Sequence, residues 1–122
     1  MLMAGYFDLS EFECKCKDKH CEGKLPQMRM SPTLIQSLNR IREELKKPIR
    51  VTSGFRCTAH NAAVGGVSHS THRTGYAADI VCDDMEKLEE LVEAEKEIKG
   101  IGIAKSFIHV DVRPGIRKRW TY

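Results

Sequence analysis

Two ionisable side chains stand inside segments that otherwise look like buried strands, and this limits how the chain can fold. Asp79 interrupts the apolar run 76–81, and His109 lies in the middle of the apolar run 107–112. A buried carboxylate or imidazole is costly unless it has a partner or binds a metal. We therefore expect the two segments to be neighbouring strands whose polar side chains contribute to one shared site.

Two long helices are indicated by apolar residues at helical spacing. The first begins at the Ser31–Pro32 pair, which suits an N-cap followed by the first helical position, and it stops before Pro48. The second is capped by Asp83 or Asp84 and is expected to continue to Gly100. A short helix is also expected at 58–64.

Strands alternate with these helices along the chain. The expected strands are 49–53, 76–81 and the two arms of a hairpin, 101–104 and 107–113. The prediction is an α+β fold over residues 1–122, a single compact domain with a small antiparallel sheet and flanking helices. Residues 1–30 form a loop-rich segment that contains three of the cysteines.

Length and charge exclude several classes of protein. The 122 residues carry 20 Lys+Arg against 17 Asp+Glu, too balanced a charge to indicate a nucleic-acid binder. No stretch reaches the roughly 18–20 apolar residues that span a membrane. Residues 1–7 lack the charged start of a secretory signal, so we expect synthesis in the cytoplasm and export by another route. We expect a monomer.

The five cysteines leave three interpretations open. Cys14, Cys16 and Cys21 fall within eight residues, whereas Cys57 and Cys82 stand apart. The cluster could form a structural metal site, with Cys57 as a fourth ligand to a second zinc ion, although its spacing is not the usual paired one. It could instead form disulfides outside the cell, or remain as thiols. A nucleic-acid-binding role would need an aromatic platform or a strongly basic face, and neither is present.

A loop histidine completes a possible metal site. His72 lies seven residues before Asp79, and with His109 it would supply two imidazoles and a carboxylate. This is a usual ligand set for catalytic zinc, which lowers the pKa of a water in the fourth position. The alternative is that His109 is a satisfied core histidine and Asp79 a capping carboxylate, and spacing alone does not decide between them.

A family resemblance favours the metal site. The run S-x-H-x-x-G-x-A-x-D at 70–79, followed by H-V-D at 109–111, resembles the zinc D-Ala-D-Ala carboxypeptidases of peptidase family M15, especially the small members from phages and bacteria. Further matching segments are 12–16, 53–57, 60–66, 107–113 and 119–120. The resemblance implies a Hedgehog/DD-peptidase-like fold and places the zinc ligands at His72, Asp79 and His109.

The resemblance also implies roles for residues beside the metal. Arg56 matches the arginine that in relatives holds the substrate carboxylate or polarises its carbonyl, a role that suits a planar guanidinium. Ser70 is expected to hydrogen-bond substrate or loop backbone. The general base of several relatives would fall on Ser106 or Phe107, and neither residue can act as a base.

Asp111 is the nearest substitute for the missing base. It lies two residues beyond His109 on the same strand, so both side chains project from the same face. It could act as the base, or it could accept a hydrogen bond from a ligand histidine and orient that ring. His69 and His60 are weaker candidates for the base.

The resemblance predicts a zinc metallopeptidase that hydrolyses peptide bonds of bacterial peptidoglycan. The reaction would be that of a D-Ala-D-Ala carboxypeptidase or of an endopeptidase of the endolysin type, with the wall stem peptide as partner. Without a signal peptide, the enzyme would reach the wall by phage-type or other non-classical release. The alternative is a non-catalytic zinc-binding homologue that binds wall peptide or a protein partner.

Overall fold

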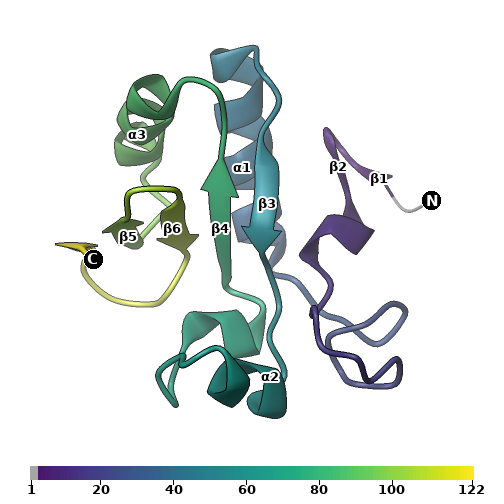
Figure 1. Ribbon diagram of the computed structural model, residues 1–122. Coiled ribbons are helices and arrows are strands. Elements are labelled where there is room, and N and C mark those ends of the chain that lie inside the picture. The colour runs from purple at the N-terminus through teal and green to yellow at the C-terminus, as the bar shows by residue number, and fades with distance from the viewer. Residues whose placement is uncertain (1–2) are drawn as a thin grey trace.

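A five-stranded sheet forms the centre of the computed structural model, which describes residues 3–122 (Figure 1). The strands are β3 (Arg50–Ser53), β4 (Ala77–Val81), β5 (Gly100–Ile103), β6 (Ile108–Asp111) and β7 (Lys118–Thr121), in the spatial order β3-β4-β6-β5-β7. Neighbouring strands are antiparallel except for the parallel pair of β5 and β7. The strands expected around 49–53 and 76–81 and the hairpin at 101–113 are confirmed, whereas β7 was not expected.

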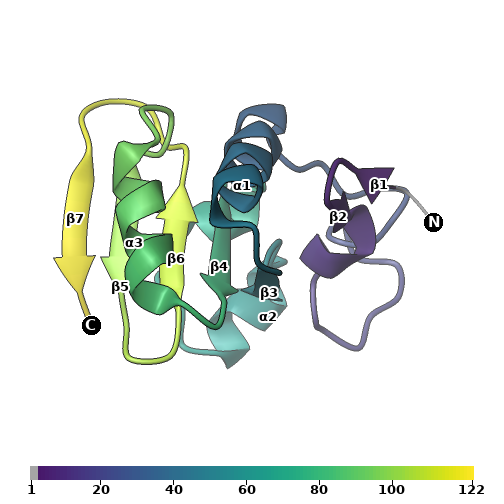
Figure 2. The ribbon, with the colours of Figure 1, turned by 90° about the horizontal axis from the view of Figure 1, so that it is seen from above.

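Helices α1 (Pro32–Leu45) and α3 (Met85–Ala94) cover one face of this sheet (Figure 2). The first begins as expected: the Ser31 side chain accepts a hydrogen bond from the backbone N–H of Leu34, and Pro32 follows. It ends before Lys46, whose backbone adopts the left-handed conformation with φ of 59°. The α+β class is therefore confirmed.

The second long helix is shorter than the sequence indicated. Asp84 is its N-cap and accepts a hydrogen bond from the N–H of Lys87, but the helix ends at Ala94 rather than near Gly100. Ile98 fits the helical spacing and is fully buried, yet it lies in the turn that follows the helix. The expectation was wrong there because burial of one residue does not distinguish a helix from a packed turn.

Alternation along the strands gives the sheet two chemically different faces. The helix-covered face is apolar and contains Ile80, Ile101, Ile108 and Val110, all of them buried. Asp79 and His109 are direct partners in the antiparallel pairing of β4 with β6, so both project from the other face. The two polar residues in apolar strands are neighbours, as expected.

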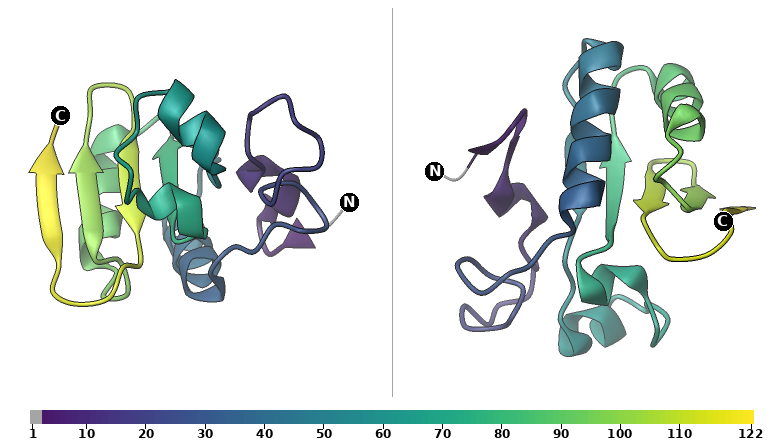
Figure 3. Two further views of the ribbon diagram at one scale, coloured as in Figure 1. Left: turned by 90° about the horizontal axis from the view of Figure 1, so that it is seen from below. Right: turned by 180° about the vertical axis from the view of Figure 1, so that it is seen from behind.

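The second face meets two short helices. They are α2 (Thr58–Ala63) and the 3-10 helix η2 (Thr71–Thr74), which lie beyond the lower ends of β3 and β4 in Figure 1. When the sheet is seen from below, α1 and α3 lie behind the strands (Figure 3, left). The helix expected at 58–64 is confirmed with one residue fewer, and η2 was not expected.

The N-terminal segment lies beside β3 and contains little regular structure (Figure 1). Strands β1 (Met3–Ala4) and β2 (Phe7–Asp8) form a two-stranded antiparallel ribbon, and the 3-10 helix η1 (Leu9–Phe12) follows. The rest, up to Ser31, is loop, as expected for the segment 1–30, whose first two residues lie outside the described range. Within residues 3–122, no helix is long and apolar enough to cross a membrane.

Candidate metal centre

Three side-chain atoms meet at the polar face of the sheet in a nearly equilateral triangle. His72 Nε2 and His109 Nδ1 each lie 3.1 Å from Asp79 Oδ1, and the two nitrogens are 3.2 Å apart. A tetrahedral zinc ion with ligand distances of roughly 2.0–2.1 Å sets its ligand atoms about 3.3–3.4 Å apart. The triangle therefore fits zinc after a movement of a few tenths of an ångström.

Three different elements supply these atoms. Asp79 and His109 face each other across β4 and β6, and His72 comes from η2. The hydroxyl of Ser70 caps η2 by accepting a hydrogen bond from the backbone N–H of His72. Gly75, with φ of 78°, then turns the chain into β4. A residue with a side chain would be strained in this left-handed conformation, so the Gly in the motif has a physical reason.

The second nitrogen of each imidazole has its own hydrogen-bond partner. His72 Nδ1 lies 2.7 Å from the carbonyl oxygen of Gly54, and His109 Nε2 lies 2.7 Å from Asp111 Oδ2. Both partners are acceptors, so these nitrogens carry the ring protons. When a metal ion is bound, His72 Nε2 and His109 Nδ1 are therefore the unprotonated nitrogens, and both lie beside Asp79 Oδ1, as ligands of one ion must.

Asp111 lies behind His109 and is fully buried. Its carboxylate accepts two hydrogen bonds from the Arg113 guanidinium, at 2.8 and 2.7 Å, and one from the Arg113 backbone N–H. The Thr71 hydroxyl lies 3.3 Å from the same carboxylate. Asp111 does not line the cavity described below, so its contacts are those of a residue that orients His109.

Both carboxylates are ionised at neutral pH in spite of their burial. Without a metal ion, burial by itself raises the pKa of Asp79, but hydrogen bonds donated by the protonated rings of His109 and His72 outweigh it and lower that pKa to about 2. Burial also opposes ionisation of Asp111, whose pKa Arg113 and His109 nevertheless bring well below its usual value. Burial favours neutral His109, but Asp111 and Asp79 together raise its pKa above the ordinary value.

The triangle forms the floor of a cavity of about 570 Å³. Its other wall residues come from the segment that ends at the start of η2, from either side of β6 and from the C-terminal end of the chain: Val64, Gly65, Gly66, Val67, His69, Ser70, Thr71, Phe107, Arg113, Trp120 and Tyr122. The cavity is large enough for several residues of a peptide, and its lining contains both aromatic and polar groups.

Arg56 lies at the edge of this cavity, next to the triangle. Its guanidinium is 3.4 Å from Asp79 Oδ2 and donates to the Ser53 hydroxyl at 3.1 Å and to the Asn61 side chain at 3.4 Å. Its backbone N–H donates to the carbonyl of His72 at 2.9 Å. The side chain is 16% exposed, so it can reach a ligand in the cavity.

The structure gathers most of the residues that the sequence singled out. His72, Asp79, His109, Arg56 and Ser70 all line one cavity. Of the other residues considered as a base, Phe107 and His69 belong to the wall, whereas Asp111, Ser106 and His60 do not. The metal, substrate and catalytic roles themselves remain predictions.

Two residues of the cavity wall, Trp120 and Arg113, were not predicted from the sequence to belong to the site. The Trp120 ring lies 5.3 Å from the His109 ring, over Gly102, where a Cβ would meet the indole nitrogen at 2.6 Å. The Arg113 guanidinium stacks 5.2 Å above the Trp120 ring. Arg113 continues the alternation of β6. Gly100 and Gly102 of β5 leave room for the side chains of Asp111 and Trp120, which a Cβ at those positions would meet.

The comparisons with known proteins agree with this geometry. The family model described as Peptidase M15 matches residues 5–111, which is most of the chain. No curated protein matches the chain. The chain belongs to peptidase family M15, whose members are zinc-dependent, and its His72, Asp79 and His109 form a group that could hold a metal ion.

Proposed function

We propose that this member of peptidase family M15 is a zinc metallopeptidase that hydrolyses peptide bonds in the stems or cross-links of bacterial peptidoglycan. The observation that carries the proposal is the triangle of His72, Asp79 and His109 at the floor of a cavity, with a guanidinium beside it. Bound zinc supplies Lewis-acid activation of a water molecule and of the scissile carbonyl.

The residues around the triangle suit a peptide that carries a carboxylate. Arg56 has guanidinium N–H groups left over after its three internal contacts and can hold that carboxylate or polarise a carbonyl. The Ser70 hydroxyl accepts from the backbone N–H of His72, which leaves its own proton for a substrate carbonyl. Trp120 and Tyr122 give the cavity an apolar wall for short aliphatic side chains such as those of alanine.

Proton transfer requires a group that reaches the cavity. Asp111 is buried behind His109 and has its oxygens occupied, so we assign it the orienting role instead of the base. Among the described wall residues outside the triangle, His69 is the one with an imidazole, which can both accept and donate a proton. We propose His69 as the proton-transfer residue, because histidine is the commonest general acid or base and this one lines the cavity.

The cleavage test uses the zinc-loaded protein with purified peptidoglycan and soluble stem peptides, and products are identified by mass spectrometry. We expect new amine and carboxyl termini that disappear on chelation and return with zinc. His69→Gln should lower kcat by about 10²–10⁴-fold with unchanged zinc content. His60→Gln, on a residue outside the cavity wall, is the matched control.

The alternative function is a zinc protein that binds wall peptide without cleaving it. This alternative is favoured by one observation: among the described residues that line the cavity, Asp79 is the one carboxylate, so no second carboxylate is there to act as a general base. A binding protein would show zinc-dependent binding of the stem peptide but would produce no new amine or carboxyl termini from peptidoglycan of any chemical type. This result would overturn the proposed peptidase activity. Action at the cell wall after phage-type release is part of the proposal. Release of wall fragments by protein added from outside the cell would support it.

A further inference from the structure

A second group of ligand-type side chains lies apart from the cavity, in the N-terminal segment. The four sulfur atoms of Cys14, Cys16, Cys21 and Cys57 all lie within 4.8 Å of one another. We propose that these four cysteines form a structural zinc site that fastens the loop-rich N-terminal segment to the segment that carries Arg56. The proposal is independent of the peptidase activity.

The spacing of the sulfur atoms fits a tetrathiolate metal site. With a zinc–sulfur distance of roughly 2.3 Å, tetrahedral geometry places the sulfurs about 3.8 Å apart. The Sγ atoms of Cys16 and Cys21 are 3.5 Å apart, and the whole group stays within 4.8 Å. Four sulfurs that all lie within 4.8 Å of one another, none of them in a disulfide, indicate a single central ion more than two separate covalent bonds, which would draw the atoms together in pairs.

Backbone N–H groups are directed at two of the sulfurs. The N–H of Cys57 lies 3.4 Å from Cys14 Sγ, and the N–H of His60 lies 3.4 Å from Cys57 Sγ. Such donors stabilise thiolate ligands and orient them toward a metal. Lys24 adds positive charge beside the cluster, because its ammonium donates to the carbonyls of Cys14 and Cys16. A tetrathiolate zinc site has net negative charge, which this ammonium partly offsets.

The chain geometry brings the fourth cysteine to the other three. The N–H of Phe55 donates to the carbonyl of Phe12 at 2.8 Å, and Gly54 packs so closely on Phe12 that a Cβ there would clash with its backbone. The N–H of Cys14 donates to the carbonyl of Gly23 at 2.8 Å and closes the loop around the cluster. The cluster thus joins two segments that are more than thirty residues apart in the sequence.

The position of Cys57 links this site to the cavity. It directly follows Arg56 and caps α2, so an ion that holds Cys57 also fixes the backbone from which the guanidinium extends. Cys14, Cys21 and Cys57 are buried, and the segment around them has hardly any regular structure of its own. A loop of this kind gains stability when a metal ion ties it to the rest of the domain.

Metal analysis of the purified, reduced protein tests the site. We expect two zinc ions per chain in the unaltered protein, and one in Cys57→Ser and one in His72→Gln, because each substitution removes one site. Cys82→Ser is the matched control and should keep two, because Cys82 lies outside the cluster. An unchanged zinc content in Cys57→Ser would overturn the proposal.

Cobalt substitution keeps the test decisive if Cys57→Ser does not fold. Cobalt(II) in the unaltered protein should give the intense thiolate charge-transfer and visible bands of a tetrahedral tetrathiolate site, and these should persist in His72→Gln. Absence of these bands would contradict the site. A mass lowered by the hydrogens lost in disulfide formation, in protein purified without reductant and with one zinc, would likewise show that the cysteines are paired and not metal-bound.

Discussion

Replacement of Asp111 by asparagine separates its two possible roles, because the substitution keeps the shape of the side chain and removes its charge. The carboxylate receives hydrogen bonds of 2.7–2.8 Å from His109 and Arg113, and it is fully buried. The Oδ2 atom accepts from His109 Nε2 and Arg113 Nη2, and Oδ1 accepts from Arg113 Nε and the Arg113 backbone N–H, whereas asparagine has an acceptor oxygen at only one of these two positions. If that oxygen takes the Oδ1 position, the amide N–H₂ faces His109 Nε2 and favours the tautomer with the proton on Nδ1, the nitrogen that belongs to the metal triangle.

The expected magnitude follows from these contacts. Removal of a residue that orients a metal-binding histidine typically lowers metal affinity by about 10–100-fold, which is about 1.4–2.7 kcal/mol. The metal-free protein also loses charge-assisted hydrogen bonds of about 1.5–3 kcal/mol each. Arg113 is 27% exposed and can recover part of this from water, so we expect the lower end, about 1.5 kcal/mol of unfolding free energy.

Three measurements on Asp111→Asn check this reasoning. Zinc affinity is measured by competition with a chromogenic chelator, stability by urea unfolding of the metal-free protein, and peptidase activity at saturating zinc. Asp83→Asn has the same charge change at an exposed position and is the control. We expect weaker zinc binding and an activity within about tenfold of the unaltered protein once zinc saturates. Unchanged zinc affinity with a loss of about 10²–10⁴-fold in kcat would refute the orienting role and make Asp111 the base.

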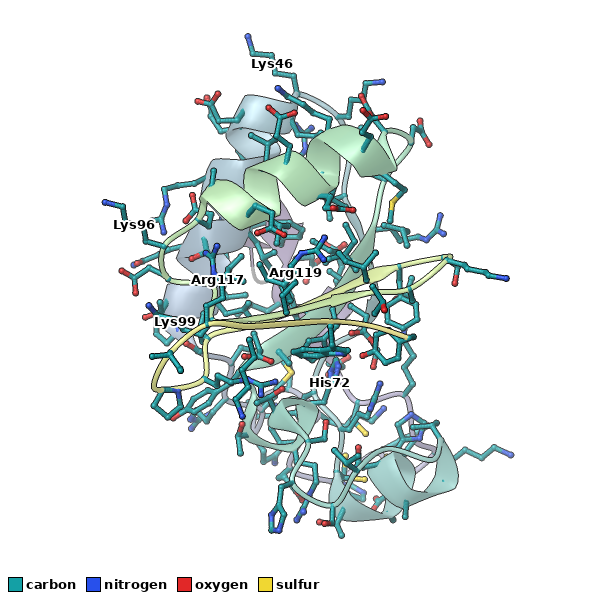
Figure 4. The ribbon with its side chains drawn as sticks, turned by 90° about the vertical axis from the view of Figure 1, so that its left-hand side faces the viewer. Lys46, His72, Lys96, Lys99, Arg117 and Arg119 are labelled. Atoms are coloured by element: carbon teal, nitrogen blue, oxygen red, sulfur yellow. The ribbon has the colours of Figure 1, made fainter. Side chains whose placement is uncertain are left out.

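Three further predictions concern residues around the site. Arg56→Met should lower kcat/KM for a carboxylate-bearing peptide by about 10–100-fold while zinc content stays the same, since a charge-assisted contact of about 1.5–3 kcal/mol is lost; retained kcat/KM in steady-state assays would exclude this role. Gly100→Ala places a Cβ against the Asp111 carboxylate and should cost about 1–3 kcal/mol in urea unfolding, with weaker zinc binding. Arg119→Ala removes ion pairs to Glu89 and Glu93 on the far side of the sheet (Figure 4), and because these are exposed we expect a change under about 1 kcal/mol and unaltered zinc affinity.

The sequence predicts the shared site well because local alternation determines it. Once 107–112 is a strand, His109 must project from the face opposite Ile108 and Val110, and the pairing of β4 with β6 makes Asp79 its partner on that face. The same holds for the start of α1, where Ser31 and Pro32 act through contacts within one turn. In both places the decisive interactions are close in sequence or follow a simple period.

The C-terminal strand could not be predicted in the same way. The run Lys118–Thr121 has no apolar alternation: Trp120 lies over Gly102 of β5, and Arg119 pairs with Glu89 and Glu93 of α3. Its parallel pairing with β5 is not local, because β6 lies between the two strands in the chain. Trp120 therefore becomes a cavity wall only through tertiary structure, and the convergence of Cys57 with the N-terminal cysteines has the same kind of origin.

The charge balance of the site is consistent with the zinc ion and the carboxylate-bearing peptide of the proposed function. Asp79 is paired with Arg56 through one oxygen, and Asp111 is paired with Arg113, so with neutral imidazoles the four charges cancel. A divalent ion in the triangle then gives the cavity a net positive charge in surroundings where solvent screening is weak. We expect an incoming carboxylate to be attracted to this charge and to contact Arg56, which lines the cavity. On the proposed function, the preference for an anionic ligand would therefore come from the divalent ion, whose charge the two neutral Asp–Arg pairs leave uncompensated.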